Sequence, residues 1–254
     1  MFSEWELLTG LSSAELLYAV IAIGGAAFIR GYSGFGFSAL TVTSLTLILP
    51  PAEVVPTAFL LEIAASIHML PLVWKKIDWK VLSWLILGAI LGTPFGIFFL
   101  EQVPPDQLRI LISCLVLAAC ILLLKNFRIS KTAGRGLTTG VGCFSGLVNG
   151  VAAIGGLPVV LFLLSTSSGA ALSRASLVAY FFFTDIYAVL LSGNQQLISA
   201  PLLWRTGLLI LPLIIGIYLG HRRFVSSTPE SFRKFALSLL IVLSLAGLVR
   251  GLLL

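Results

Sequence analysis

The sequence predicts an all-α, polytopic integral membrane protein built from two inverted-topology repeats. Of the 254 residues, 58% are hydrophobic and only 10% are charged, whereas soluble domains carry about 25% charged residues. The apolar residues form long continuous runs, which is the pattern of membrane-spanning helices. Matched residues also recur at constant offsets in the two halves of the chain. Inverted repeats with broken helices are typical of secondary transporters.

Ten apolar segments follow one another with short connections. They are residues 14–29, 35–50, 54–74, 80–100, 108–124, 137–148, 152–165, 172–191, 201–220 and 232–250. A full span needs about 20 residues, so the two segments that begin at 137 and 152 are short, and glycine and arginine interrupt the first pair. Each half therefore begins with a Gly-broken helix pair, re-entrant or short, followed by three spanning helices. We predict two membrane repeats, residues 1–125 and 126–254.

Charge predicts the orientation of these segments. Clusters of Lys and Arg lie around the connections at 75–80, 125–135 and 220–234, whereas the connections at 101–107 and 192–200 carry none. Cytoplasmic loops are enriched in Lys and Arg, so the acidic N-terminus is expected outside the cell inner (plasma) membrane. The number of crossings before the first basic cluster must then be odd, so the two members of a broken pair either both cross or both re-enter.

The two halves also match residue by residue. Eight pairs align at nearly constant offset: Arg30 with Asn149, Gly31 with Gly150, Gly36 with Gly155, Glu62 with Asp185, Gly92 with Gly216, Gly96 with Gly220, Pro105 with Pro229, and Arg109 with Arg233. The spacing of the glycines in Gly92-x-x-x-Gly96 and Gly216-x-x-x-Gly220 predicts close helix packing.

The first break, Arg30-Gly31-Tyr32-Ser33-Gly34-Phe35-Gly36, places one cation among three glycines. A cation at the centre of a membrane helix costs about 2.5–3.5 kcal/mol on insertion scales. Arg30 either lies at the cytoplasmic end of a full span or marks a site at mid-depth. We favour the site, because a helix that begins near Gly34–Gly36 would point free N–H groups at the same spot. Arg30, Gly31, Ser33, Gly34 and Gly36 are the predicted substrate-binding residues of this half.

The second break, Asn149 to Gly156, repeats this design with an amide in place of the cation. Asn149 could donate to an anion or could be a turn residue at the end of a helix. Pro158 fits the first turn of a helix that begins at Gly155–Gly156. The predicted binding residues of this half are Asn149, Gly150, Gly155 and Gly156. Three hydroxyl groups near the breaks either donate to substrate or bond carbonyls of their own helices: Ser38, Thr41 and Ser145.

Glu62 and Asp185 are carboxyl groups in the middle of apolar segments. Such residues carry protons in membrane transporters or pair with a cation or a backbone donor, and both interpretations stay open. A coupling proton on Glu62 or Asp185 is therefore one expectation. Tyr180 and the Phe181–Phe183 run are expected to pack or to face lipid.

The sequence contains no motif of an enzyme, a metal-binding protein or an ATP-driven transporter. Cys114, Cys120 and Cys143 have no metal-ligand spacing, and neither a Ser/His set nor a zinc motif is present, so we predict no metal, no cofactor and no enzyme. There is no GxxxxGK[ST] motif for ATP. The net charge of +6 comes from clusters between apolar runs, so nucleic acid is not an expected partner.

The motifs GYSGFGFS (residues 31–38) and GLVNGVAAIGGLP (residues 146–158), with a basic loop between matched halves, resemble the TauE/SafE sulfite exporter-like family of membrane permeases. The resemblance covers essentially the whole chain. It implies transport of sulfite, of organosulfonates such as sulfoacetate, or of related carboxylates. It places the family's glycine motifs on Gly31, Gly34 and Gly36 and on Gly150, Gly155 and Gly156. The second motif is often three glycines, whereas here it reads Ile154-Gly155-Gly156-Leu157.

We therefore expect a secondary transporter, an exporter by preference, that holds a small sulfur-containing anion between two broken-helix N-termini and Arg30. A full charge in one half and only an amide in the other favours a monoanion, or a dianion with one neutralised charge. The alternatives are a permease for small carboxylates or other organic anions, and a non-transporting membrane subunit. The expected partners are the anionic substrate and the lipid bilayer. The sequence leaves open the exact substrate, the coupling ion and whether the chain forms a homo-oligomer.

Overall fold

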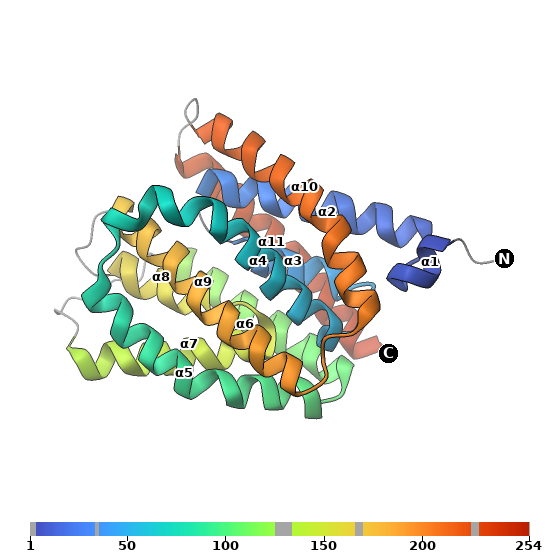
Figure 1. Ribbon diagram of the computed structural model, residues 1–254, viewed down its shortest axis with the longest axis horizontal. Coiled ribbons are helices and arrows are strands. Elements are labelled where there is room, and N and C mark those ends of the chain that lie inside the picture. Colours follow the sequence, from blue (N-terminus) through green and yellow to red (C-terminus); the bar gives the residue numbers. More distant parts are fainter. Residues whose placement is uncertain (1–3, 34–35, 125–133, 166–169, 225–228, 254) are drawn as a thin grey trace.

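The computed structural model describes residues 4–33, 36–124, 134–165, 170–224 and 229–253, and within these ranges every regular element is a helix (Figure 1). The elements are α1 (Glu4–Thr9), α2 (Ser13–Ser33), α3 (Phe37–Leu45), α4 (Pro51–Val73), the short 3-10 helix η1 (Trp74–Lys76), α5 (Trp79–Gln102), α6 (Pro105–Leu124), α7 (Arg135–Ala152), α8 (Gly156–Ser165), α9 (Ala170–Asn194), α10 (Ala200–Phe224) and α11 (Pro229–Leu253). The all-α prediction is confirmed, and each predicted apolar segment corresponds to one helix from α2 to α11. The predicted repeat boundary, between residues 125 and 126, lies outside the described residues.

Several helices carry apolar side chains on their outer faces. Five helices in the described part of the chain are long and apolar enough to cross a membrane: Ser13–Tyr32, Trp79–Gln102, Pro105–Leu124, Leu172–Asn194 and Ala200–Arg222. On α5, Leu91, Phe95 and Phe98 are more than half exposed, which would be costly in water and is favourable in lipid. The predicted polytopic membrane protein is confirmed.

Both predicted helix breaks are present. In the first half α2 ends at Ser33, and α3 begins after Gly36, whose φ of 91° lies in the left-handed region that favours glycine. In the second half α7 ends at Ala152 and α8 begins at Gly156, and between them Ala153 adopts a φ of 54°. Pro158 lies in the first turn of α8, as predicted. The interpretation of Asn149 as a turn residue is wrong, because α7 continues past it and the cap is Ala153.

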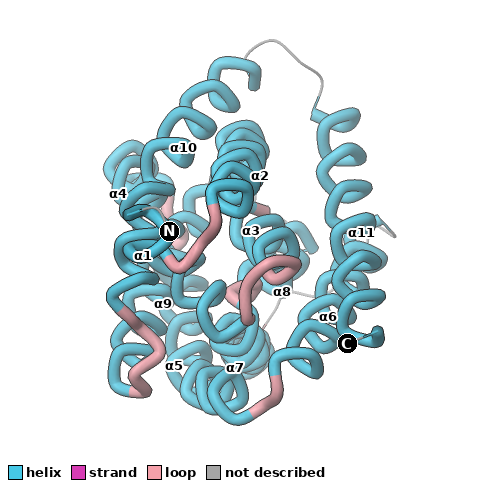
Figure 2. The backbone as a smooth tube through the Cα atoms, turned by 90° about the vertical axis from the view of Figure 1, so that its right-hand side faces the viewer, coloured by secondary structure: helices cyan, strands magenta, loops and turns pink. Residues whose placement is uncertain are grey.

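Each broken pair returns to the end of the molecule from which it started (Figure 1). Helix α2 runs from the end that holds the N-terminus, α3 turns back, and α4 begins at that end again. Helices α7 and α8 do the same from the opposite end. Of the two possibilities that parity allowed, we therefore propose re-entry in both halves. Figure 2 shows α3 and α8 in the interior, surrounded by the longer helices.

Glycines bring two helix pairs into close contact, α2 with α10 and α5 with α7. A Cβ atom on Gly220 would lie 2.1 Å from the Phe28 carbonyl oxygen, and one on Gly92 would lie 2.0 Å from the Cys143 carbonyl oxygen. Because a methyl group cannot fit at these distances, only glycine permits the observed spacing. The predicted close packing at both Gly-x-x-x-Gly motifs is confirmed.

The largest contacts between helices of the two halves join helices at related positions in their halves. The first helix of each half packs on the fourth helix of the other half (α2 on α10, α7 on α5), while α4 packs on α9 and α6 on α11. A two-fold relation between the halves would produce this pattern. We therefore propose that the halves are inverted repeats that interleave rather than lie side by side.

Candidate functional site

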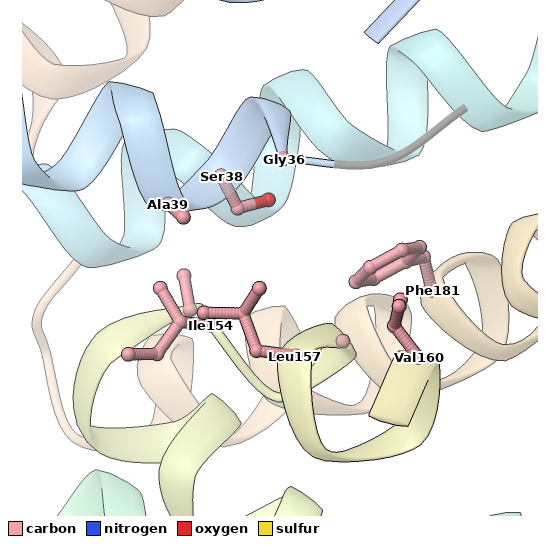
Figure 3. A pocket seen from close by; sticks show the side chains of 9 residues that line it. Gly36, Ser38, Ala39, Ile154, Leu157, Val160 and Phe181 are labelled. Atoms are coloured by element: carbon pink, nitrogen blue, oxygen red, sulfur yellow. The ribbon is translucent and has the colours of Figure 1, made fainter. Parts of the chain in front are cut away.

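The two helix breaks line one small cavity in the interior (Figure 3). The start of α3 contributes Gly36, Ser38 and Ala39. The start of α8 and the turn before it contribute Ala153, Ile154, Gly156, Leu157 and Val160, and α9 contributes Phe181. The cavity volume is ≈ 10 Å³, which is about the space that one water molecule requires. The sequence-based expectation that the breaks meet is confirmed.

Two helix N-termini therefore border the cavity. The first turns of α3 and α8 carry backbone N–H groups that have no partner within their own helix, apart from Pro158, which has no N–H. The partial positive charge at a helix N-terminus favours an anion. This arrangement alone does not define a ligand, but a buried cation lies beside it.

Arg30 is that cation. It lies in the last turn of α2 and is fully buried. Its Nη1 forms an ion pair with Glu62 on α4, and its Nη2 donates to Ser66 Oγ at 3.1 Å. The guanidinium carbon lies 5.5 Å from the centre of the Phe181 ring, within the range of a cation–π contact. Within the part of the chain that the structure describes, the Nε–H group of Arg30 has no hydrogen-bond partner, so this donor of a buried guanidinium is available to a ligand.

Glu62 connects this ion pair to the cavity. Its second carboxylate oxygen accepts a hydrogen bond from Ser38 Oγ at 2.7 Å, and Ser38 lines the cavity. Of the two interpretations of Glu62, the structure shows the pairing with a cation. Ser38 donates to Glu62 across helices, whereas Thr41 Oγ1 is buried without a partner.

The second half holds a counterpart of this pair that contains no cation. Asn149 Nδ2 donates to Asp185 Oδ1 at 2.8 Å, and Asn149 Oδ1 accepts from the Gly155 N–H group at 3.2 Å. Ser145 Oγ donates to the Gly155 carbonyl oxygen and lies 2.7 Å from the Tyr180 hydroxyl group. The amide of Asn149 thus links the backbone of the break to α9.

The predicted glycines divide into two groups. A Cβ atom on Gly156 would lie 1.9 Å from Phe181 Cζ, and one on Gly155 would lie 2.5 Å from Asn149 Cβ, so both belong to the site. Gly31 and Gly150 face other helices, Ile217 of α10 and Thr93 of α5 respectively, and the structure gives them a packing contact. Gly34 and the side chain of Ser33 lie outside the described residues.

Sequence reasoning missed three residues of this site. Of the two expectations for Phe181, the structure shows packing, because the side chain is buried and contacts Arg30, but its place in the lining of the cavity was not predicted. Tyr180 is fully buried and bonded to Ser145, and Ser66 bonds Arg30. Spacing could have found two of them, since residues four apart share a helix face. Phe181 precedes Asp185 by four residues, and Ser66 follows Glu62 by four.

The charged groups of the site influence one another through space. Asp185 interacts electrostatically with Glu62 and Arg30, and Arg174, on the same helix as Asp185, interacts with Arg30. Among the described residues, no three His, Cys, Asp or Glu side chains gather to hold a metal ion. The arrangement is suited to a small polar anion, for which Arg30, Ser38 and the two helix N-termini offer donors.

Comparison with known proteins points in the same direction. The model of the family "Sulfite exporter TauE/SafE" matches residues 18–247. The chain is similar to a protein of Cupriavidus necator (strain H16) named "Probable sulfite/organosulfonate exporter TauE", with 25% identity over 240 residues that cover 90% of this chain and 93% of that protein. No solved structure matches the chain. Because the family model spans most of the sequence and includes both breaks, the chain belongs to the sulfite exporter TauE/SafE family.

Proposed function

We propose that the protein is a secondary transporter that exports small sulfur-containing anions, such as sulfite or an organosulfonate, across the inner membrane. One observation carries the proposal: a fully buried arginine, Arg30, lies beside the cavity at which the short helices α3 and α8 begin. Membership of the TauE/SafE family and the name of the C. necator relative support the choice of sulfur anions.

The donors around the cavity fit an oxyanion. Arginine presents five N–H groups in a planar fork that matches oxyanions bidentately, and Arg30 has an unused Nε–H donor. The first turns of α3 and α8 add backbone N–H groups, and Ser38 adds a hydroxyl group. A trigonal or tetrahedral SO₃ group could accept from several of these donors at once.

The present cavity is too small for such a substrate. Its volume of ≈ 10 Å³ corresponds to about one water molecule, so the cavity must widen before an SO₃ group can enter. The side chains that separate Arg30 from the cavity must move before an anion can reach it. Phe181 both lines the cavity and contacts Arg30, and Glu62 is paired with the guanidinium, so these two side chains are the ones we expect to move.

The helix arrangement supports alternating access with the N-terminus outside. Lys75 and Lys76 belong to η1, Arg135 begins α7 and Arg222 lies near the end of α10. These helix ends lie at the end of the molecule opposite to the N-terminus (Figure 1), as the positive-inside rule requires for a cytoplasmic end. The re-entrant pairs enter from opposite ends and meet at the cavity. Rocking of one half against the other about this point would open the site to each side in turn.

A thermal-shift panel on detergent-purified protein tests the proposal. We expect sulfite, sulfoacetate, sulfolactate, taurine or 2-hydroxyethanesulfonate to raise the melting temperature more than matched carboxylates do. A ligand at 100 times its Kd stabilises the folded state by about 2.7 kcal/mol. Stabilisation by carboxylates alone would contradict the choice of sulfur anions, and stabilisation by none of the compounds would contradict the binding site.

Arg205→Ala is a matched control for changes at Arg30. Arg205 is also a fully buried arginine, but it pairs with Glu53 between α10 and α4, away from the cavity. The variant should keep the ligand-dependent shift. Loss of the shift would mean that the assay reports general damage to the protein.

A further inference from the structure

We infer that Glu62 is a built-in anion that exchanges for the substrate on Arg30, so that each anion binds together with one proton. The inference rests on the proposed function. In this exchange the hydrogen bond from Arg30 Nη1 to the Glu62 carboxylate breaks, and a hydrogen bond from Arg30 to a substrate oxygen forms. A proton from solvent adds to the released carboxylate and forms an O–H bond. No electrons are transferred.

The burial of the ion pair requires the exchange. The side chains of Arg30 and Glu62 are each 1% exposed, so water screens neither charge. A substrate anion that joined the intact pair would place a second negative charge beside Glu62 in a site of low dielectric constant. Neutralising Glu62 removes this repulsion and leaves Arg30 with one counter-charge, as in the empty protein.

The structure already holds a hydrogen-bond acceptor for a protonated Glu62. Ser38 Oγ lies 2.7 Å from Glu62 Oε2 and donates to it when the carboxylate is ionised. A hydroxyl group can donate or accept, so Ser38 can rotate its hydrogen away and accept from a neutral Glu62. Because Ser38 lines the cavity, this contact also joins the carboxyl group to the space that solvent would enter.

The other charged groups near Glu62 do not replace it in this role. Helix α9 contributes Asp185 and Arg174, helix α10 contributes Arg205, which is paired with Glu53, and helix α6 contributes Arg109, which is paired with Asp106. Asp185 bonds the amide of Asn149 and does not occupy Arg30. In the described part of α3, α5 and α7, the charged residues lie only near helix ends: Lys80, Glu101 and Arg135.

The exchange determines how much net charge crosses the membrane with each substrate anion. The empty site holds Arg30 and an ionised Glu62, whereas the loaded site holds Arg30, one monoanion and a neutral Glu62. The two forms carry the same net charge. Transport of a monoanion is therefore electroneutral with the proton as co-substrate, and the membrane potential should leave its rate unchanged.

Binding of 2-hydroxyethanesulfonate to purified protein in weakly buffered solution tests the inference, because a sulfonate stays singly charged at any pH used. We expect uptake of one proton for each anion bound. By linkage, the apparent affinity should then rise about tenfold for each unit of decrease in pH. In Glu62→Gln the amide cannot take up the proton, so the affinity should become independent of pH. The wild-type proton uptake does not depend on any variant folding.

Glu53→Gln is the matched control, since it removes another carboxyl group of α4 that also pairs with an arginine, Arg205, but does not line the cavity. It should keep both the proton uptake and the pH dependence. Binding without proton uptake, or a pH dependence that Glu62→Gln keeps, would overturn the inference and leave the proposed function intact. Failure of the wild-type protein to bind any sulfur anion at any pH would overturn the proposed function and the inference with it.

Discussion

The two halves of the molecule place different chemistry at matched positions. Where the first half has Arg30 bonded to Glu62, the second half has Asn149 bonded to Asp185. In both cases a residue in the last turn of the first helix contacts a carboxyl group on the third helix of the same half. Only the first pair contains a cation. The comparison suggests that the first half supplies the charge for an anion, while the second half fixes the backbone of its own break.

The backbone contacts of the two pairs support this division. Asn149 accepts from Gly155 N–H within its own break, so its amide has a structural task. Arg30 instead bonds the side chains of Glu62 and Ser66 and packs against Phe181, and within the described residues its Nε–H group has no partner. A side-chain partner can change its rotamer, whereas a backbone partner is held by the chain, so we infer that Arg30 exchanges its partner at lower cost than Asn149 does.

The largest effect should come from removing the charged pair as a unit. In the double variant Arg30→Gln/Glu62→Gln no buried charge is left unpaired, so the protein should fold. Binding of 2-hydroxyethanesulfonate should weaken by about 100-fold or more, because losing a buried charge partner costs about 2–5 kcal/mol. Isothermal titration would measure this, with Glu62→Gln as the variant that keeps Arg30. Equal affinity in the double variant and the wild type would contradict the role of Arg30.

Asn149→Ala should act on stability more than on affinity. It leaves Asp185 and the Gly155 N–H group without their observed partners, and a buried polar group without a partner costs about 1–3 kcal/mol. The melting temperature should fall, while the ligand-dependent shift of the surviving folded protein stays. A stable variant that has lost the shift would show that Asn149 binds the anion directly, and the comparison of the two halves would then fail.

Gly92→Ala and Gly216→Ala test whether the two halves are equivalent in packing. Each added methyl group would meet backbone of a neighbouring helix, at 2.0 Å for Gly92 and 2.5 Å for Gly216. Overpacking of this kind costs about 1–3 kcal/mol. Thermal unfolding should show similar losses in both variants. Gly207→Ala on α10, with open space around its Cβ position, is the control and should be close to neutral.

A smaller effect is expected from Phe181→Leu. The substitution removes the aromatic contact with Arg30 and widens the cavity next to Gly156. A partly buried cation–π contact contributes about 0.5–2 kcal/mol, so affinity for sulfite should fall a few-fold, whereas larger organosulfonates should lose less. Competition binding would measure the ratio. An unchanged ratio would remove Phe181 from the list of residues that set substrate size.

The sequence could predict the helices and the position of the site, because apolar runs and glycine breaks are local signals. Residues 30–36 and 149–156 each contain glycines and a polar residue within an apolar run, and their constant offset in the two halves predicted that they belong to one site. The bond between Arg30 and Glu62 could not be predicted in the same way. The two residues are separated by 32 positions, and they meet because α3 packs on both α2 and α4, which no local signal in the sequence predicts.

Phe181 shows a second limit of prediction from sequence. An aromatic residue in an apolar run carries the same hydropathy whether it faces lipid or a cavity, so composition cannot assign its face. Asn149 shows a third limit of prediction from sequence. The local sequence allowed a helix to end before Gly150. The contact of α7 with α5 and the bonds of Asn149 to Asp185 and Gly155 instead favour a longer α7. In each case a tertiary contact decided between local alternatives.

Flux of radiolabelled sulfite in proteoliposomes tests the central claim most directly, because it measures transport rather than binding. Vesicles that contain wild-type protein or Arg205→Ala should show saturable flux that follows the sulfite gradient. Vesicles with the double variant Arg30→Gln/Glu62→Gln should show no more flux than protein-free vesicles. Saturable flux through the double variant, or none through the wild type, would contradict the claim that Arg30 at the meeting of the two breaks holds the transported anion.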